Sequence, residues 1–242
     1  MNKTIMMMTI KQFWSRKARI LIAAVFMIFP FVMDMMMRQV HHEKILSAAG
    51  SAHVVPLLVL VIGAGIIGQD VSDGILPSIL SRPIERWKYV FSKWFAISSL
   101  VIGLAVITLC CHVIYAYCIT SNFPTEIAAT LASIVLLSFG TMSVMLLLSS
   151  LLPGAADLGV ILLLCVASFV MFILEEALKI PGMSAAASNI FAVLFPSFDP
   201  GDIKSLQSLF SIEVGRYVSV VLVCLCGSII LVNQKELSYG SN

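Results

Sequence analysis

Six long runs of apolar residues dominate the hydrophobic pattern of this chain. A helix needs about 20 apolar residues to cross roughly 30 Å of hydrocarbon, and each run is close to that length. The runs lie at 20–37, 48–68, 94–119, 127–152, 158–174 and 214–232. The pattern therefore predicts an all-α integral membrane protein with six transmembrane helices. Residues 1–242 then form a single transmembrane domain, with no room for a separate soluble catalytic domain.

A polar segment at 69–93 separates the second and third runs and has its own helical signals. Pro77 has no backbone N–H to donate, so a short helix must begin near Gly74. Pro83 disfavours the helical conformation at Arg82 and suits the first position of a second helix. Four apolar residues between the prolines share one helical face: Ile75, Leu76, Ile79 and Leu80.

Composition indicates a membrane protein, and the distribution of charge predicts the orientation of the chain across the membrane. The chain is 60% hydrophobic and only 12% charged, about half the charge of an average soluble domain. Ten basic residues fall on one side of the predicted spans: Lys3, Lys11, Arg16, Lys17, Arg19, Arg82, Arg86, Lys88, Lys93 and Lys235. Five fall on the other: Arg38, Lys44, Lys179, Lys204 and Arg216. The positive-inside rule therefore predicts that both termini and the 69–93 segment are cytoplasmic.

Two further segments are predicted to lie at a membrane surface. In residues 1–19, three apolar residues recur at helical spacing: Met6, Ile10 and Phe13. This predicts an interfacial cytoplasmic helix, the alternative being an ordinary basic flank that sets topology. The outer segment 175–212 is too long for a plain connection. Its apolar part at 185–195 is too short to cross, so we expect a re-entrant or interfacial piece before the sixth span.

Asp34 and Arg38 form a candidate intramembrane pair near the outer end of the first span. They are four residues apart and therefore lie on the same helical face. A carboxylate at that depth is costly unless it is paired or hydrated, which indicates a functional site. The alternative is a structural pair that reaches the outer surface.

Gly63, Gly65 and Gly68 match the dinucleotide-binding pattern G-x-G-x-x-G within the second span. That motif needs a helix opened by its third glycine and an acidic residue about 20 positions on. Asp70 and Pro77 follow the third glycine instead, and Tyr89, Val90 and Phe91 stand where the acidic residue should be. We therefore interpret this stretch as close helix packing, with Ala64 and Gly68 forming a small-xxx-small face.

The polar segment resembles the cytoplasmic loop of the type 2 permeases of ATP-binding-cassette (ABC) exporters. Their pattern is a Gly, an acidic residue, an acidic-polar-Gly turn, a short helix, Ser-x-Pro-x-x-Arg, and a basic residue opening the third span. The corresponding residues here are Gly68, Asp70, Ser72-Asp73-Gly74, Ser81-Arg82-Pro83-Ile84-Glu85-Arg86 and Lys93. Two positions depart from the pattern: Ile75 stands where a Thr is common, and Pro77 lies inside the expected short helix.

This resemblance implies the transmembrane permease subunit of an ABC exporter, multi-pass in the plasma membrane, here a bacterial inner membrane. The implied partners are a separate ABC ATPase subunit carrying ATP and magnesium, a second permease chain in a homodimer or heterodimer, and the lipid bilayer, with no nucleic acid. Residues 69–93 would be a coupling loop whose short coupling helix docks the ATPase. The implied docking residues are Asp70, Asp73, Gly74, Ile75, Leu76, Ile79, Leu80, Arg82 and Arg86.

Motifs for bond-making chemistry are absent from the sequence. It contains no GxxxxGK[ST], HExxH or GxSxG pattern, and its six cysteines form no CxxC pair and are interpreted as small hydrophobes. We therefore expect a non-catalytic chain that binds no metal or cofactor itself. The alternative is a membrane-embedded redox or haem-binding subunit with His112 and His53 as ligands. A visible absorption spectrum of the purified protein distinguishes the two.

Overall fold

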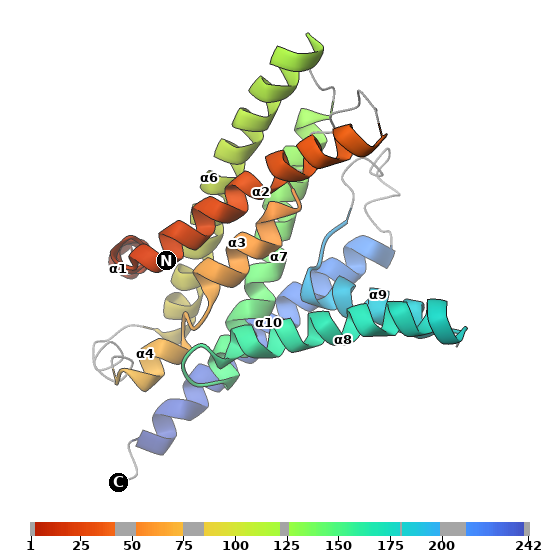
Figure 1. Ribbon diagram of the computed structural model, residues 1–242. Coiled ribbons are helices and arrows are strands. Elements are labelled where there is room, and N and C mark those ends of the chain that lie inside the picture. Colours follow the sequence, from red (N-terminus) through yellow and green to blue (C-terminus); the bar gives the residue numbers. More distant parts are fainter. Residues whose placement is uncertain are drawn as a thin grey trace.

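In the computed structural model of this protein, the described residues form helices and turns, with no strand among them (Figure 1). The structure describes residues 3–41, 52–74, 85–121, 126–179, 181–198 and 212–239, without the side chains of 33–34, 37–41, 120, 178 and 235–239. The expected coupling helix falls outside the described residues. The prediction of an all-α protein is confirmed.

Each expected apolar span is helical in its described part, and the second is divided between two helices. Five segments of the described chain are long and apolar enough to cross a membrane: Val54–Ser72, Arg86–Ile119, Ile127–Leu151, Ala156–Ala177 and Ile212–Gln234. The expected first span, 20–37, lies within α2 (Lys17–His41), which is not one of these five. The chain is thus a multi-pass membrane protein, and the count of six spans stays a prediction.

The spans alternate in direction between two ends of the molecule, except the one at Ala156–Ala177, which extends sideways from the bundle (Figure 1). Their bounds are α3 (Val54–Gly63), α4 (Gly68–Ser72), α6 (Arg86–Thr120), α7 (Ile127–Leu151), α8 (Ala156–Leu178) and α10 (Ile212–Tyr239). We call the end where α4 stops and α6 begins the loop end. The last turns of α10 also lie at this end, where the Asn233 side chain accepts a hydrogen bond from Arg86. We call the end where α3, α7 and α10 begin the far end.

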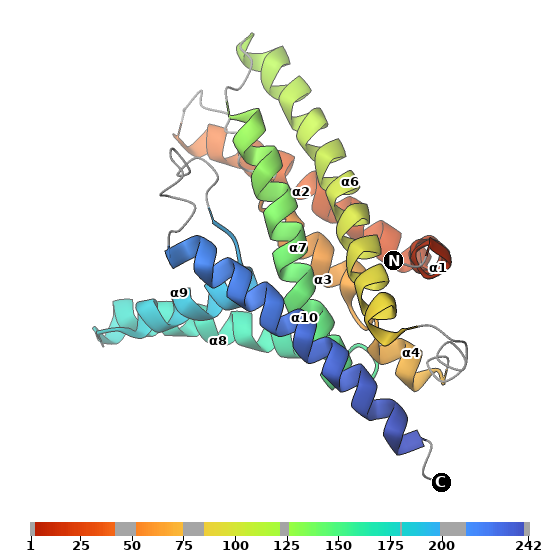
Figure 2. The same ribbon diagram turned by 180° about the vertical axis from the view of Figure 1, so that it is seen from behind.

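Helix α7 is the centre of the bundle and packs against α3, α6 and α10 (Figure 2). Helix α10 is fixed to it by the Tyr217 hydroxyl, which donates to the Leu136 carbonyl oxygen at 2.9 Å. Helix α6 is fixed by the Trp94 indole, which donates to Ser143 Oγ at 3.0 Å. A helix that is apolar on all sides is suited to such a buried position.

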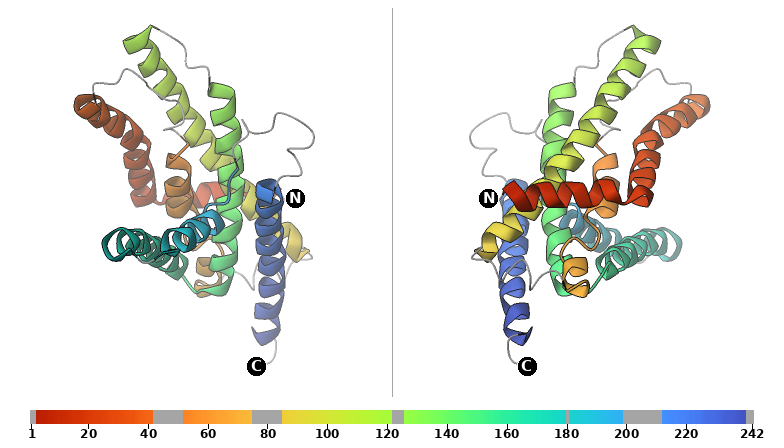
Figure 3. Two further views of the ribbon diagram at one scale, coloured as in Figure 1. Left: turned by 90° about the vertical axis from the view of Figure 1, so that its right-hand side faces the viewer. Right: turned by 90° about the vertical axis from the view of Figure 1, so that its left-hand side faces the viewer.

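Helices α8 and α9 (Met183–Leu194) lie side by side and extend away from the rest of the bundle (Figures 1 and 3). Glu175 of α8 accepts a hydrogen bond from the backbone N–H of Ser184 in the first turn of α9. The apolar stretch expected at 185–195 is therefore a helix of 12 residues. After it, the chain returns to α7, where the Pro196 carbonyl lies against Gly140.

The N-terminal segment forms α1 (Lys3–Ser15), which lies across α6 (Figure 3). Its buried residues are Ile5, Thr9 and Phe13, whereas Trp14 is exposed. The contact face is thus turned slightly from the predicted one, with Ile5 and Thr9 more buried than Met6 and Ile10. The chain then turns at Arg16, and α2 begins at Lys17.

Candidate functional site: a polar break in the second apolar span

The second apolar span is two helices separated by a non-helical break. Helix α3 ends at Gly63, Ala64 leaves the helical conformation with a ψ of 124°, and Gly65 has a φ of +67° before α4 starts at Gly68. This corrects the expectation of one continuous helix over 48–68. Ala64 and Gly68 do not lie on one helical face, so the expected small-xxx-small face does not form.

Glycine is required at two positions of this break. A Cβ on Gly65 would lie 2.7 Å from the Gly154 carbonyl oxygen, and one on Gly68 would lie 2.5 Å from the same atom. The short turn between α7 and α8 therefore packs directly on the backbone of the break. A hydrogen bond joins the turn to the break as well: the Gly154 N–H donates to the Gly68 carbonyl oxygen at 3.1 Å.

Two buried side chains accept hydrogen bonds from the backbone N–H groups of the break. Asp157 Oδ2 accepts from the Gly65 N–H at 2.7 Å. Ser149 Oγ accepts from the N–H groups of Ile67 and Gly68, at 3.0 and 3.1 Å. Unpaired buried backbone donors are costly, so these two residues make the break stable. The other oxygen of Asp157, Oδ1, accepts from the Leu158 N–H at 2.8 Å, so this carboxylate bonds both to the break and to the first turn of α8.

The free carbonyl oxygens of the break accept hydrogen bonds from two cationic side chains. Arg19 donates to the Ala64 carbonyl at 2.9 Å and to the Ile62 carbonyl at 3.4 Å. Lys93, at the base of α6, donates to the Ile66 carbonyl. Cations are suited to this position because broken helices leave carbonyl oxygens without partners.

Asp70 lies in α4 just after the break and is buried with two partners from α6. The Lys93 ammonium forms an ion pair with Asp70 Oδ2, and the Tyr89 hydroxyl donates to the same oxygen at 2.8 Å. The exposed fractions are 5% for Asp70, 2% for Lys93 and 0% for Tyr89. Asp70 was expected to contact a docked partner, but its carboxylate lies inside the protein. Its charge can be buried there because Lys93 supplies the counter-charge.

Together these side chains form a connected group that we call the polar hub: Arg19, Asp70, Tyr89, Lys93, Ser149 and Asp157. They come from α2, α4, α6, α7 and α8. The hub therefore connects five helices to one stretch of backbone at the loop end.

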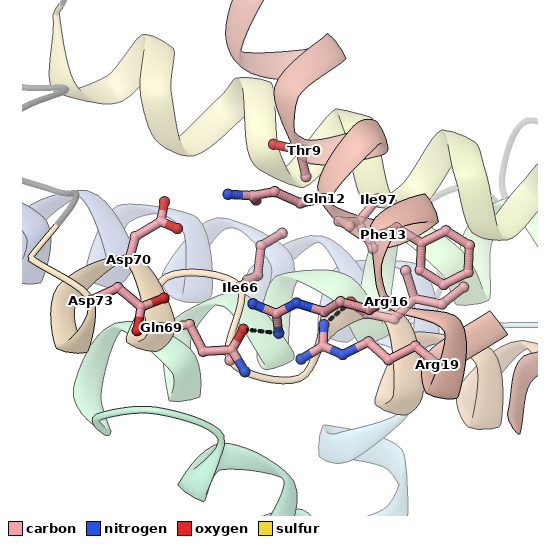
Figure 4. A pocket seen from close by; sticks show the side chains of 12 residues that line it. Thr9, Gln12, Phe13, Arg16, Arg19, Ile66, Gln69, Asp70, Asp73 and Ile97 are labelled. Carbon is pink, nitrogen blue, oxygen red and sulfur yellow. Dashed lines mark hydrogen bonds between the residues drawn. The ribbon is translucent and has the colours of Figure 1, made fainter. Parts of the chain in front are cut away.

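A cavity of about 30 Å³ lies beside the hub, between α4 and the turn from α1 to α2, with room for roughly one or two water molecules. Figure 4 shows Arg16 and Arg19 reaching toward α4, where Gln69, Asp70 and Asp73 line the opposite wall. Arg16 donates a hydrogen bond to the Gln69 side chain. The charged groups of the hub thus form hydrogen bonds or ion pairs with backbone groups and with one another.

The other expected docking residues have different environments. Asp73 and Gly74 are exposed at the end of α4, and Gly74 has a φ of +66°. Arg86 is bonded to Asn233, as noted above. Ile75, Leu76, Ile79, Leu80 and Arg82 lie outside the described residues.

Glu85 marks the point where the described chain resumes before α6. Its carboxylate accepts hydrogen bonds from Lys88 Nζ at 2.7 Å and Trp87 Nε1 at 2.5 Å. Both hydrogen bonds lower the pKa of the Glu85 carboxyl, and the bond from Lys88 has the larger effect. This exposed pair lies in the same first turns of α6 as buried Lys93.

The remaining candidates from the sequence are not brought to the hub. Asp34 and Arg38 lie in α2, and their side chains are not described. The ring of His112 packs against that of Phe31, with centroids 5.5 Å apart, whereas His53 lines a cavity at the far end. Within the described ranges, no group of three His, Cys, Asp or Glu residues is placed to hold a metal ion.

Sequence reasoning missed Arg19, Tyr89, Ser149 and Asp157 as members of a single site. A signal was present: each lies near an end of an apolar segment, and all those ends were expected on the same side of the membrane. The glycines of the second span were a further signal, because glycine inside a helical pattern often marks a break.

Comparison with known proteins adds no further evidence, since no protein-family model, curated protein or solved structure matches this chain.

Proposed function

We propose that this chain is the transmembrane permease subunit of an ABC exporter in a bacterial inner membrane, with both termini cytoplasmic. A separate ATPase subunit docks on residues 69–93 and hydrolyses ATP, and two permease chains assemble with two ATPase chains. The observation that carries the proposal is the polar hub. It ties both flanks of the 69–93 segment, through Asp70 and Lys93, to the break in the second span.

The hub offers a route for force from the loop to the spans. A partner that pushes on residues 75–84 acts on α4 and on the first turns of α6 together, because Asp70 is bound to Tyr89 and Lys93. The break at Gly65 lets α4 pivot relative to α3 without rupturing helical hydrogen bonds. Ser149 and Asp157 pass the movement to α7 and α8.

In the docking surface that we propose, some residues contact the ATPase directly and one acts from inside the protein. Ile75, Leu76, Ile79 and Leu80 provide the apolar contact face, and exposed Asp73 and Gly74 lie at its edge with Arg82 and Arg86. Asp70 acts from inside as a positioning residue.

The first test changes the proposed contact face. Leu80→Asp should remove ATPase activity from the complex purified through this chain, because docking would bury an unpaired charge. Removing a buried side chain of this size alone costs about 2–5 kcal/mol. The measurements are magnesium-dependent ATP hydrolysis and the identity, by mass spectrometry, of a co-purified subunit with a GxxxxGK[ST] loop.

Ser78→Ala is the control for this test, since we place Ser78 near the opposite face of the short helix. It should retain ATP hydrolysis and the co-purified ATPase subunit. Normal coupled hydrolysis in Leu80→Asp, or ATP turnover by the verified lone chain, would contradict the proposal.

The second test is topology, which the basic residues predict. On a background without the six native cysteines, single cysteines at Ser51, Ser121 and Ser205 should react with an impermeant thiol reagent added outside intact cells. Ser78→Cys and Ser238→Cys should react only after the membrane is permeabilised. External labelling of Ser78→Cys would refute the orientation.

A further inference from the structure

A second and larger cavity, of about 620 Å³, opens at the far end where α3, α7 and α10 begin. Residues of α7 and α10 are among those that line it, and these two helices pack against each other (Figure 2). Binding sites for small molecules typically measure about 300–1,000 Å³. The cavity is on the opposite end of the molecule from the polar hub, so it is a separate feature.

Charged groups of both signs surround this cavity. His53, Glu126, Glu213 and Arg216 all line it. In the described part of the chain, these four side chains form no ion pair or hydrogen bond with one another or with any other group. Two carboxylates and a guanidinium are thus available to a ligand that itself carries both charges.

The residues of α7 that line the cavity become less polar along the helix. Glu126, Thr130, Ser133 and Leu137 line it, and their spacing places them on one helical face. The distance from Glu126 to Leu137 along the helix axis is about 16 Å at 1.5 Å per residue. The cavity therefore has charged residues at one end, which we call its mouth, hydroxyl groups further along α7, and the apolar Leu137 beyond them.

We infer that this cavity binds an amphiphile whose head group carries an ammonium and a phosphate, as in a zwitterionic phospholipid. The Arg216 guanidinium pairs with the phosphate, and Glu126 and Glu213 pair with the ammonium. The N-termini of α3 and α7 favour an anion at the mouth as well, since neither has a side-chain cap. The apolar part of the ligand lies along α7 toward Leu137. This inference goes beyond the proposed function and does not depend on an ATPase partner.

Lipid titration of the purified full chain in detergent, followed by native mass spectrometry, tests the charges at the mouth. Dihexanoyl phosphatidylethanolamine should bind about tenfold more tightly than the phosphatidylglycerol analogue, which has no ammonium group. Glu213→Gln should reduce this preference, the double variant Glu126→Gln with Glu213→Gln should abolish it, and Arg216→Gln should weaken the binding of both lipids about tenfold. Glu176→Gln, which removes an exposed charge from α8, should bind both lipids as the wild type does.

A pair of neighbouring substitutions tests the cavity itself. Ala129→Phe places a ring in the cavity and should reduce phosphatidylethanolamine binding at least tenfold, whereas Ala128→Phe, on an adjacent exposed position that does not line it, should not. Far-UV circular dichroism shows that both variants are folded. Phosphoethanolamine alone should fail to displace the lipid, because it has no apolar part to lie against α7 near Leu137.

Three results would overturn the inference. Equal binding of the two lipids by the wild type would remove the role of the carboxylates. Equal effects of Ala129→Phe and Ala128→Phe would place the lipid elsewhere on the protein. Displacement by phosphoethanolamine at lipid-like concentrations would mean that the site takes a soluble head group and not an amphiphile.

Discussion

Lys93→Met is expected to lower the free energy of unfolding by about 3–5 kcal/mol, the usual cost of removing one partner from a buried ion pair. Methionine keeps most of the volume of the lysine stem but leaves the Asp70 carboxylate buried with only Tyr89 as a partner. It also removes the donor to the Ile66 carbonyl. The measurement is the unfolding midpoint of the purified chain in detergent, followed by circular dichroism.

Lys88→Met is the matched control, because Lys88 lies earlier in the same helix, α6, and also pairs with a carboxylate, Glu85. That pair is exposed, and exposed pairs contribute little, so the unfolding midpoint should barely move. The double variant Asp70→Asn with Lys93→Met should recover much of the loss, since no unpaired charge remains. Equal midpoints for Lys93→Met and Lys88→Met would show that the hub ion pair does not hold the fold.

Gly68→Ala is expected to destabilise the protein by about 1–3 kcal/mol or more, the usual cost of overpacking a filled site. The added methyl would lie 2.5 Å from the Gly154 carbonyl and 2.6 Å from that of Leu152. Both neighbours are backbone atoms, so relief requires moving the turn between α7 and α8. The hydrogen bond from the Gly154 N–H to Gly68 would then be lost.

Gly159→Ala gives the opposite expectation from the same chemical change. Gly159 lies inside α8, and an added methyl there would meet no packing neighbour within 4 Å. Alanine is favoured over glycine in a helix by about 0.8–1 kcal/mol. The unfolding midpoint of this variant, followed by circular dichroism in detergent, should therefore be unchanged or slightly higher. Comparable losses in both variants would mean that the close approach at Gly68 is not what limits the substitution.

These two predictions also bear on the proposed transport function. Lys93→Met and Gly68→Ala both act on the route from the loop to the spans and leave residues 75–84 unchanged. A variant that stays folded and still binds the ATPase subunit should therefore lose transport while it retains ATP hydrolysis. Leu80→Asp should instead lose the ATPase subunit itself.

The sequence alone determined the helical architecture and the approximate limits of its elements. Runs of about 20 apolar residues can satisfy their backbone groups in hydrocarbon only as helices. The short run at 185–195 was therefore recognisable as a separate piece, and it is α9. The basic flank before the first span was likewise recognisable as a helix, and it is α1. Each of these conclusions depends on neighbouring residues in the chain.

Only the tertiary structure decided that the second span is broken and that Asp70 is internal. The break is stable because Ser149 and Asp157, more than 80 residues away in the sequence, accept its backbone hydrogen bonds. Asp70 is internal because Lys93 and Tyr89 face it from another helix. Apolar periodicity describes a helix and the face it buries, but it carries no information on which distant polar group satisfies a backbone N–H or a buried charge.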